Sequence, residues 1–339
     1  MYLLFWIVIF IFSLAVLIKS ADYFTQSSER IGIDLKIPPF IVGIAIVSIG
    51  TSLPELATSL TAVFRGQTEI VTANAVGSNI ANVFLVIGIA AIVARKISIK
   101  RSLINLDLPL LACATTIGIF ILLDKKVTFL EGAILCATYI IYLFYIVSSK
   151  KERKILNHIT ENEKNNKENH TNHRKKINAN TFKKIWNYKP KVEIGVTFTL
   201  LISAFFIYLG ASYTVESLIN IATELNVATS LIVMSAVSIG TSLPELVVSV
   251  GAVMKKKYEI ALGNVFGSNI FNVLIVIGVP ALIADLTMDD ATFYIGIPFL
   301  IGATILYIFS GISRKIYNWE GMMYLVIYLL FLTKIFGIV

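Results

Sequence analysis

The chain has 339 residues, of which 56% are hydrophobic and only 15% are charged, and its mean hydropathy is +0.80. This composition excludes a soluble globular core and is typical of a polytopic membrane protein. The net charge of +8 does not indicate nucleic-acid binding, because the basic residues are concentrated in alternate loops between apolar runs.

Ten apolar runs are long enough to cross a bilayer. We therefore predict an all-α polytopic membrane protein with ten transmembrane helices. The first run has no basic segment before it and no small-residue cleavage site before Lys19, which indicates a retained span rather than a signal peptide. The predicted spans are 2–20, 38–62, 70–94, 103–123, 128–149, 193–215, 228–252, 259–284, 291–311 and 320–338.

Lysine and arginine are sorted between the two sides of this ten-span arrangement. One set of alternate loops holds 25 of the 29 basic residues, and the other set holds Arg65, Lys125, Lys126 and Lys334. The positive-inside rule makes the first set cytoplasmic. We expect a multi-pass protein of the cell membrane with both termini outside.

The chain contains one stretch twice, because residues 48–56 (SIGTSLPEL) recur letter for letter as 238–246. The offset of 190 continues through Gly77-Ser78-Asn79-Ile80, which matches Gly267-Ser268-Asn269-Ile270. We assign a first transmembrane repeat to 1–149 and a second to 193–339. Five spans per repeat is an odd number, so the two repeats have opposite orientations in the membrane, and such repeats place a binding site at their interface.

Each copy carries a polar stripe on one helical face, at positions i, i+4, i+7 and i+11. A glutamate at the bilayer centre costs about 2.5 kcal/mol or more, so it should face the protein interior or a water-filled cavity. Two glutamates at equivalent positions indicate one shared site. The stripes are Ser48, Ser52, Glu55 and Ser59 in the first copy and Ser238, Ser242, Glu245 and Ser249 in the second.

A proline lies directly before the glutamate of each stripe. Pro54 and Pro244 have no N–H to bond the carbonyl four residues back, so the carbonyls of Gly50 and Gly240 are released. Unwound backbone at membrane depth is tolerated where it lines a cavity or packs in protein. Carboxylates beside free carbonyls and hydroxyls predict an all-oxygen site for a hard cation.

The third and eighth spans carry a second stripe at i, i+4 and i+8, which we expect to face the glutamates. Asparagine and serine also join membrane helices without binding a ligand, but both stripes recur in both copies. The second stripe is Asn74, Ser78 and Asn82 in one repeat and Asn264, Ser268 and Asn272 in the other.

Between the repeats, residues 150–192 form a basic segment with the only three histidines, His158, His170 and His173. Their spacing matches no zinc motif, so a solvated cytoplasmic linker is the better interpretation. The two cysteines, Cys113 and Cys136, lie inside predicted spans, where we expect them to be buried.

The motif Gly-Thr-Ser-Leu-Pro-Glu followed by Gly-Ser-Asn-Ile, present twice in inverted repeats, resembles the sodium/calcium exchanger family of the cation/calcium antiporter superfamily, of the prokaryotic type without a regulatory domain. The alpha-1 motif is then 48–88 and the alpha-2 motif 238–278. The resemblance implies that Glu55 and Glu245 hold calcium with the carbonyls of Thr51 and Thr241. It implies sodium sites formed by Ser52, Ser78, Ser242, Ser268, the hydroxyls of Thr51 and Thr241, and the carbonyls of Ser48 and Ser238.

The chain departs from many family members at Asn272, where they carry aspartate. The middle of the site then has an amide at both Asn82 and Asn272. Potassium co-transport is therefore not expected.

These features predict a secondary active antiporter that exchanges Na⁺ for Ca²⁺ by alternating access, with electrogenic calcium export. The alternative is Ca²⁺/H⁺ exchange by the same two glutamates, although the ring of hydroxyls suits Na⁺ better. An enzyme is not expected, because no histidine lies in any predicted span and neither His-Glu-x-x-His nor Gly-x-Ser-x-Gly occurs. We expect Ca²⁺ and Na⁺ as substrates in a lipid bilayer, and no cofactor, nucleic acid or obligatory protein partner.

Overall fold

A computed structural model describes residues 2–34, 47–98, 101–145 and 193–338 of the chain. The predicted linker 150–192 and the first part of the second span, 38–46, lie outside the described residues. Within the described ranges, each of the ten predicted spans contains helix, so the predicted all-α polytopic membrane fold is confirmed. The helices of the first repeat are α1 (Tyr2–Asp34), α3 (Val47–Thr51), α4 (Leu53–Phe64), α5 (Glu69–Ala81), η2 (Asn82–Ile87), α6 (Gly88–Ala94), α7 (Arg101–Leu122) and the helix Phe129–Tyr145.

The long helices of the second repeat follow the same order as those of the first, with further short helical segments between them. Among the described residues of the whole chain, six helical segments are long and apolar enough to cross a membrane. The helices of the second repeat are α10 (Ile194–Leu225), α11 (Thr229–Ile232), η3 (Val233–Val237), α12 (Ser238–Thr241), α13 (Leu243–Met254), α14 (Tyr258–Phe271), η4 (Asn272–Val276), α15 (Gly278–Ala281), η5 (Thr292–Gly296), α16 (Ile297–Ser313) and α17 (Asn318–Ile335).

The repeated motif interrupts its helix in both copies. Ser52 separates α3 from α4 with φ −91° and ψ 10°, and Ser242 separates α12 from α13 with φ −82° and ψ 4°. The backbone N–H of Ser52 still bonds the carbonyl of Ser48 at 3.2 Å. The interruption is therefore a break of about one turn, and it is caused by the proline two residues later, which has no N–H to donate.

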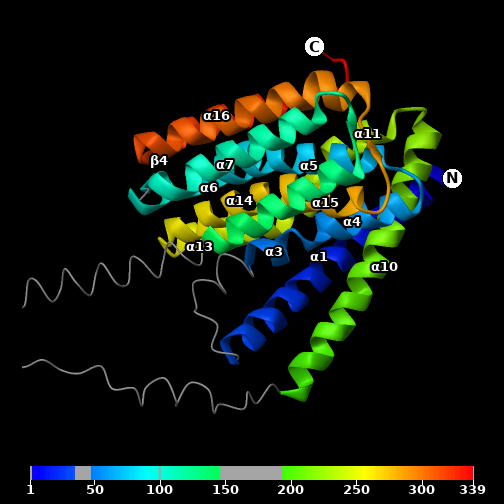
Figure 1. Cartoon of the computed structure of the whole chain (residues 1–339), viewed down its shortest axis with the longest axis horizontal. Coiled ribbons are helices and arrows are strands. Elements are labelled where there is room, and N and C mark those ends of the chain that lie inside the picture. Colours follow the sequence, from blue (N-terminus) through cyan, green and yellow to red (C-terminus); the bar gives the residue numbers. More distant parts are fainter. Residues whose placement is uncertain (1, 35–46, 99–100, 146–192, 339) are drawn as a thin grey trace, which may run out of the picture.

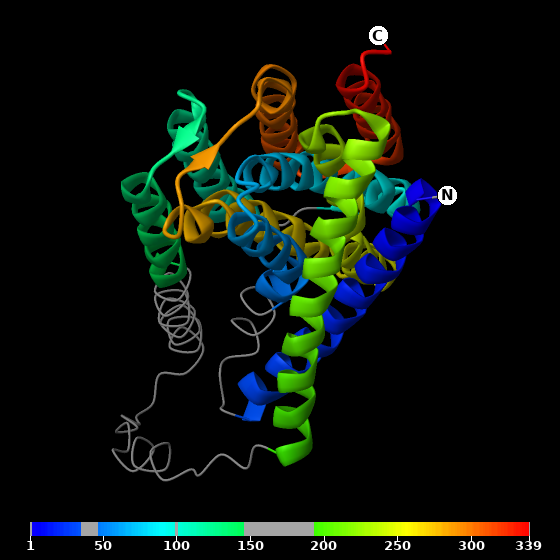
Figure 2. The same cartoon turned by 90° about the vertical axis from the view of Figure 1, so that its right-hand side faces the viewer.

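Helices α5 and α14 form the centre of the molecule, and α1 and α10 form its edge. The most apolar 18-residue windows of Glu69–Ala94 and Ile260–Ala281 are 78% and 89% buried, whereas those of α1 and α10 are 22% and 28% buried. Figures 1 and 2 show α1 and α10 side by side and inclined to the other long helices. They share a small hydrophobic cluster of their own, Leu17, Ala21, Ile207 and Ala211.

Two short β-ribbons join the repeats. Strand β1 (Lys96–Ser98) pairs antiparallel with β4 (Lys315–Tyr317), and β2 (Lys126–Val127) pairs antiparallel with β3 (Leu286–Thr287). The offset of 190 relates the position of β1 to β3 and that of β2 to β4, so each ribbon contains one strand from each repeat. The inverted topology places the two ribbons at opposite ends of the spans.

The β2–β3 ribbon is reinforced by a charged contact. Lys125 donates to the Oδ1 of Asp290 at 2.6 Å and lies 4.6 Å from the centre of the Tyr294 ring. The hydrogen bond to Asp290 raises the pKa of Lys125, so its ammonium stays charged at neutral pH.

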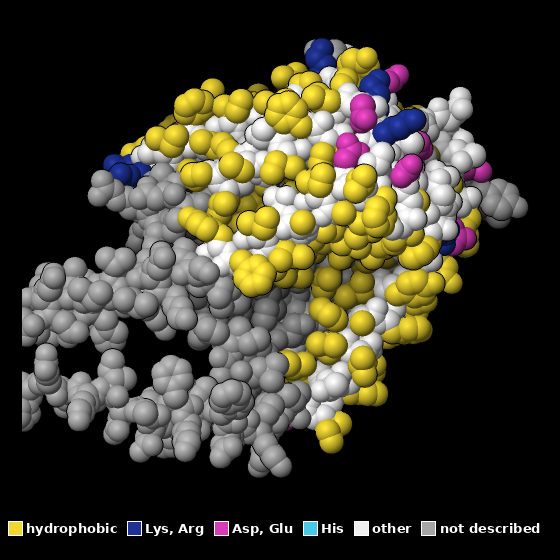
Figure 3. All heavy atoms as spheres, in the orientation of Figure 1, with side chains coloured by type: hydrophobic (Ala, Val, Ile, Leu, Met, Phe, Trp, Pro, Cys, Tyr) yellow, Lys and Arg dark blue, Asp and Glu magenta, His cyan; other side chains and the backbone are white. Residues whose placement is uncertain are grey.

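The surface is that of a membrane protein. Figure 3 shows hydrophobic side chains along the flank of the helices and charged side chains gathered toward their ends. The expectation that both cysteines are buried is wrong for Cys113, which is exposed, and Cys136 is half-buried. The spans carry apolar residues on the lipid-facing side as well as inside, so hydrophobicity alone does not identify the buried face.

Close helix packing at the repeat interface is testable at Gly77. A Cβ placed there would lie 2.3 Å from the Ser238 Oγ and 2.8 Å from the Met234 Cα. Because backbone would have to shift, we expect Gly77→Ala to destabilise the protein by about 1–3 kcal/mol. Thermal unfolding in detergent measures this, with Gly251→Ala as the matched control, since a Cβ at Gly251 meets nothing within 4 Å. Equal unfolding midpoints for the two variants would contradict the packing described.

Candidate cation site

Two glutamates from different repeats lie buried beside each other. Glu55 is in the first turn of α4 and Glu245 is in the first turn of α13, and both have 0% exposure. The two carboxylates are near enough to repel each other. Each follows the helix break, where the free N-terminal end of a helix favours negative charge.

These carboxylates have few hydrogen-bond donors. Within the described residues, neither oxygen of Glu55 has a hydrogen-bond partner, although the hydroxyls of Ser78 and Thr241 lie beside it. Glu245 Oε1 accepts a bond from the Ser52 hydroxyl at 2.9 Å, and its Oε2 has none. Removing one partner from a buried ion pair typically costs about 3–5 kcal/mol, so two buried carboxylates with so few donors suit a bound cation.

Hydroxyl groups from both repeats meet beside each glutamate, Ser78 and Thr241 at Glu55 and Thr51 and Ser268 at Glu245. The Thr51 Oγ1 lies 3.4 Å from the Ser268 Oγ, and the Ser78 Oγ lies 3.4 Å from the Thr241 Oγ1. The two pairs are equivalent by the offset of 190, which relates Thr51 to Thr241 and Ser78 to Ser268. All four residues have 4% exposure or less, so the two copies of the motif form one symmetric cluster of oxygens.

The asparagines at the start of the second stripe support the glutamate helices. Asn74 Nδ2 donates to the carbonyl of Glu55 at 3.0 Å and to the Ser59 hydroxyl at 3.1 Å. Asn264 makes the equivalent bonds to the Glu245 carbonyl at 3.4 Å and the Ser249 hydroxyl at 3.2 Å. These asparagines therefore position the backbone that carries each glutamate.

The remaining predicted residues lie in the same buried region but differ between the repeats. The Ser238 hydroxyl donates to the Val233 carbonyl at 2.8 Å, whereas the Ser48 hydroxyl has no hydrogen-bond partner within the described residues. The carbonyl of Ser48 accepts a bond from Thr51 Oγ1 at 3.3 Å. Neither the Ser242 hydroxyl nor the amide of Asn272 has a hydrogen-bond partner within the described residues.

Two asparagines in the site region were missed as candidates. Asn79 Nδ2 donates to the carbonyl of Asn269 at 3.1 Å, and Asn82 Nδ2 donates to the Asn269 Oδ1 at 3.1 Å. Since Asn79 and Asn269 are equivalent positions, their contact lies where the pseudo-twofold axis of the repeats passes. Both follow the stripe serine by one residue and so fall off the i, i+4 pattern. The recurring Gly-Ser-Asn-Ile was the signal that could have identified them.

The chemistry of this cluster is that of a hard-cation site. Within the described residues, no group of three or more His, Cys, Asp or Glu side chains gathers around a common point. The two glutamates supply a formal charge of −2, and the other ligands available are neutral hydroxyl, amide and carbonyl oxygens. Oxygen ligands of this kind suit Ca²⁺ and other hard cations.

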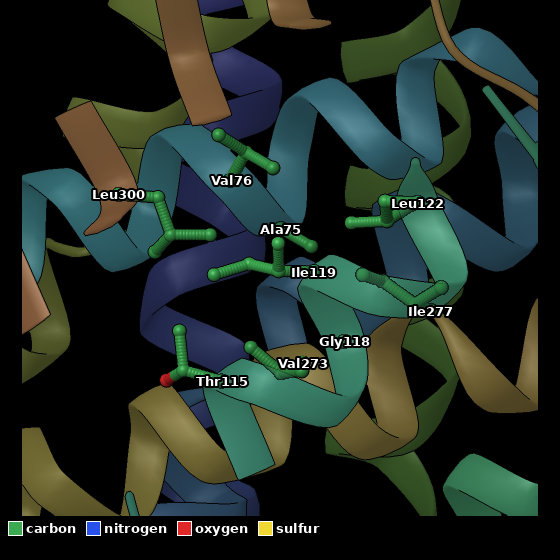
Figure 4. Close-up of a pocket in the computed structure, with 9 residues that line it drawn as sticks. All are labelled: Ala75, Val76, Thr115, Gly118, Ile119, Leu122, Val273, Ile277 and Leu300. Atoms are coloured by element: carbon green, nitrogen blue, oxygen red, sulfur yellow. The ribbon is translucent and has the colours of Figure 1, made fainter. Parts of the chain in front are cut away.

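A small cleft between α5, α7 and η4 is apolar, unlike the cation site. Figure 4 shows it lined by aliphatic side chains, with the Thr115 hydroxyl as the one side-chain oxygen drawn. It contains no charged group and does not include the glutamates. Its lining residues are Ala75, Val76, Thr115, Gly118, Ile119, Leu122, Val273, Ile277 and Leu300.

Comparisons with known proteins match nearly the whole chain. The family model for sodium/calcium exchanger protein matches residues 5–148 and 195–337. The sodium/calcium exchanger MaX1 of Methanosarcina acetivorans is 32% identical over 356 aligned residues, covering 97% of this chain and 98% of that protein. The inner membrane protein YrbG of Escherichia coli is 28% identical, covering 84% of this chain and 81% of that protein. A solved structure of the sodium-calcium exchanger NCX_Mj, soaked with Na⁺ and Sr²⁺, is similar with a TM-score of 0.63 at 26% identity, covering 97% of each chain.

The unequal hydrogen bonding of equivalent serines is testable. Ser52→Ala removes a bond to a buried carboxylate, and bonds to charged groups contribute about 1.5–3 kcal/mol. We expect Ser52→Ala to lower the thermal unfolding midpoint in ion-free buffer more than Ser242→Ala, since the Ser242 hydroxyl has no hydrogen-bond partner within the described residues. If both variants unfold at the same temperature, the Ser52–Glu245 bond does not stabilise the protein.

Proposed function

The chain belongs to the sodium/calcium exchanger protein family, and from this premise we propose that it exchanges Na⁺ for Ca²⁺ at the buried glutamates Glu55 and Glu245. Membership of this family makes it a cation/calcium antiporter of the membrane, and its relatives are transporters rather than enzymes. The observation that carries the proposal is the pair of fully buried, interacting carboxylates among hydroxyls of both repeats.

In this proposal the glutamates and the carbonyls of Thr51 and Thr241 hold calcium. Two carboxylates balance one Ca²⁺, and Na⁺ needs the same two carboxylates to balance its charge in a poorly screened interior. The two ions therefore compete for one site, as an antiporter requires. Sodium is held at the flanking oxygens, with Asn82 and Asn272 in the middle of the site. These oxygens are the hydroxyls of Ser52, Ser78, Ser242, Ser268, Thr51 and Thr241 and the carbonyls of Ser48 and Ser238.

Sodium is preferred over the proton as the counter-ion because of the neutral oxygens. Hydroxyls, amides and carbonyls can coordinate Na⁺, whereas proton exchange needs only the two carboxylates. The 32% identical relative MaX1 carries the name sodium/calcium exchanger, which supports the same choice.

Direction and orientation follow from charge. If three Na⁺ exchange for one Ca²⁺, each cycle moves one net charge, and a negative-inside potential drives calcium out of the cell. The sorting of basic residues places both termini outside and residues 150–192 in the cytoplasm.

The central residues are tested by Glu55→Gln and Glu245→Gln. Each removes one charge from the pair and should weaken calcium binding by at least about 100-fold, because an amide cannot balance a buried cation. Ion-free protein should become more stable, since the repulsion between the carboxylates disappears. Thermal unfolding with and without Ca²⁺ measures both effects. Glu69→Gln is the control, because this residue begins α5 away from the site. A calcium-induced stabilisation equal to that of the wild type in either variant would refute the assignment.

The counter-ion is tested in proteoliposomes. We expect an outward Na⁺ gradient to drive ⁴⁵Ca²⁺ uptake and an outward H⁺ gradient of equal size to leave it at background. A positive-inside potential, set with valinomycin and K⁺, should accelerate the sodium-driven uptake, because each turnover exports one positive charge. Uptake driven by the H⁺ gradient alone would instead support Ca²⁺/H⁺ exchange.

A further inference from the structure

A polar contact ties the helix that carries Glu55 to the edge helix α10. Arg65 follows α4, and its Nη2 lies 3.1 Å from the Glu216 Oε2 and 3.1 Å from the Ser212 Oγ. Glu216 and Ser212 are one turn apart on α10. The side chains of Arg65 and Glu216 are 31% and 39% exposed, so water only partly screens the ion pair. We call this contact the Arg65 clasp.

The chain keeps the components of a second clasp at the equivalent positions. The offset of 190 relates Arg65 to Lys255, which follows α13, the helix of Glu245. The same offset relates Ser212 and Glu216 to Asp22 and Gln26 on α1. Each side therefore has a cation after the glutamate helix and one acid on the facing turn of the other repeat's first helix. In α1 the acid is Asp22, at the position equivalent to Ser212. In α10 the acid is Glu216, at the position equivalent to Gln26. Each helix therefore has one acid on this turn, although at different positions.

The second clasp is open in this structure. Within the described residues no ion pair joins Lys255 to Asp22, and Lys255 is exposed. Asp22 is half-buried in an apolar span, and the cation that acts on it is Lys19, one turn earlier on the same helix. Because Lys19 is on the same helix, Asp22 has no cation from another element among the described residues.

Helices α1 and α10 are joined to each other. Arg30 of α1 lies 3.3 Å from Glu193 at the start of α10, and a Cβ on Gly210 of α10 would lie 2.9 Å from the backbone of Leu17. Because these helices pack this closely along their length (Figure 2), a shift of α10 along α4 also shifts α1 along α13.

We propose that the Arg65–Glu216 and Lys255–Asp22 pairs are alternate clasps, one closed in each access state of the exchanger. In an inverted repeat protein the two access states arise by exchanging the conformations of the repeats. The contact that Arg65 makes with α10 in one state is then made by Lys255 with α1 in the other, at the opposite end of the spans. This inference rests on the alternating exchange proposed above and adds residues that position the glutamate helices without touching the ion.

The experiment measures the balance between the two states directly. The protein in nanodiscs, with Cys113→Ser and Cys136→Ser, carries spin labels at Glu224→Cys on α10 and Lys126→Cys on β2, both exposed. Distance distributions in ion-free buffer then report how α10 lies relative to the β2–β3 ribbon. The measurement requires no transport, so it separates this proposal from the proposed function, which the proteoliposome assay tests.

Opposite shifts are expected from the two clasps. Arg65→Gln and Glu216→Gln should lower the ratio of the present conformation to the other by about two- to five-fold, the size expected for a partly exposed ion pair. Asp22→Asn and Lys255→Gln should increase it by a similar factor. The charge-reversed pair Arg65→Glu with Glu216→Arg should restore the wild-type distribution. Shifts in the same direction at both ends, no shift at either end, or no recovery in the reversed pair would overturn the proposal.

Discussion

The main physical constraint on this structure is the repulsion between two carboxylates that are buried close together. Glu55 and Glu245 have 0% exposure, and among the described residues only one of their four oxygens accepts a hydrogen bond. Such a pair is costly in a poorly screened interior unless a cation lies between its members. The helix N-terminus before each glutamate and the hydroxyl of Ser52, which donates to Glu245, reduce this cost when no ion is bound. In the proposed exchanger, one ion replaces another at this site because the empty site is unfavourable.

The duplication supplies the second member of the contacts that cross the centre of the site. Thr51 and Ser268 lie 3.4 Å apart, and so do their equivalents Thr241 and Ser78. Neither repeat contains both members of either pair. The two β-ribbons follow the same rule, because each takes one strand from each repeat. The repeats are therefore joined at the centre by the site and at both ends by ribbons, while α1 and α10 pack at the edge.

Identical sequence in the two copies does not give identical contacts. Ser52 donates to Glu245, whereas Ser242 has no partner within the described part of the chain. Asn82 donates to Asn269, whereas the amide of Asn272 has no partner there. The differences have a common origin, because a molecule built from inverted repeats is symmetric in sequence but holds one conformation at a time. A contact that one repeat makes can therefore be absent at the equivalent position of the other repeat.

The sequence by itself determined the all-α membrane fold, the two repeats and the two polar stripes, because hydrophobic length and helical periodicity are local properties. It also indicated the helix breaks, since Pro54 and Pro244 act on their own turn. Only the tertiary structure decided that Asn79 meets Asn269, that Cys113 faces outward, and that Arg65 rather than Lys255 holds an edge helix. Each of these depends on how far two helices have slid or rotated against each other. A shift of one helix by less than one turn breaks one hydrogen bond and makes another without altering any local pattern. Both arrangements are therefore compatible with the sequence, and the packing of the helices decides between them.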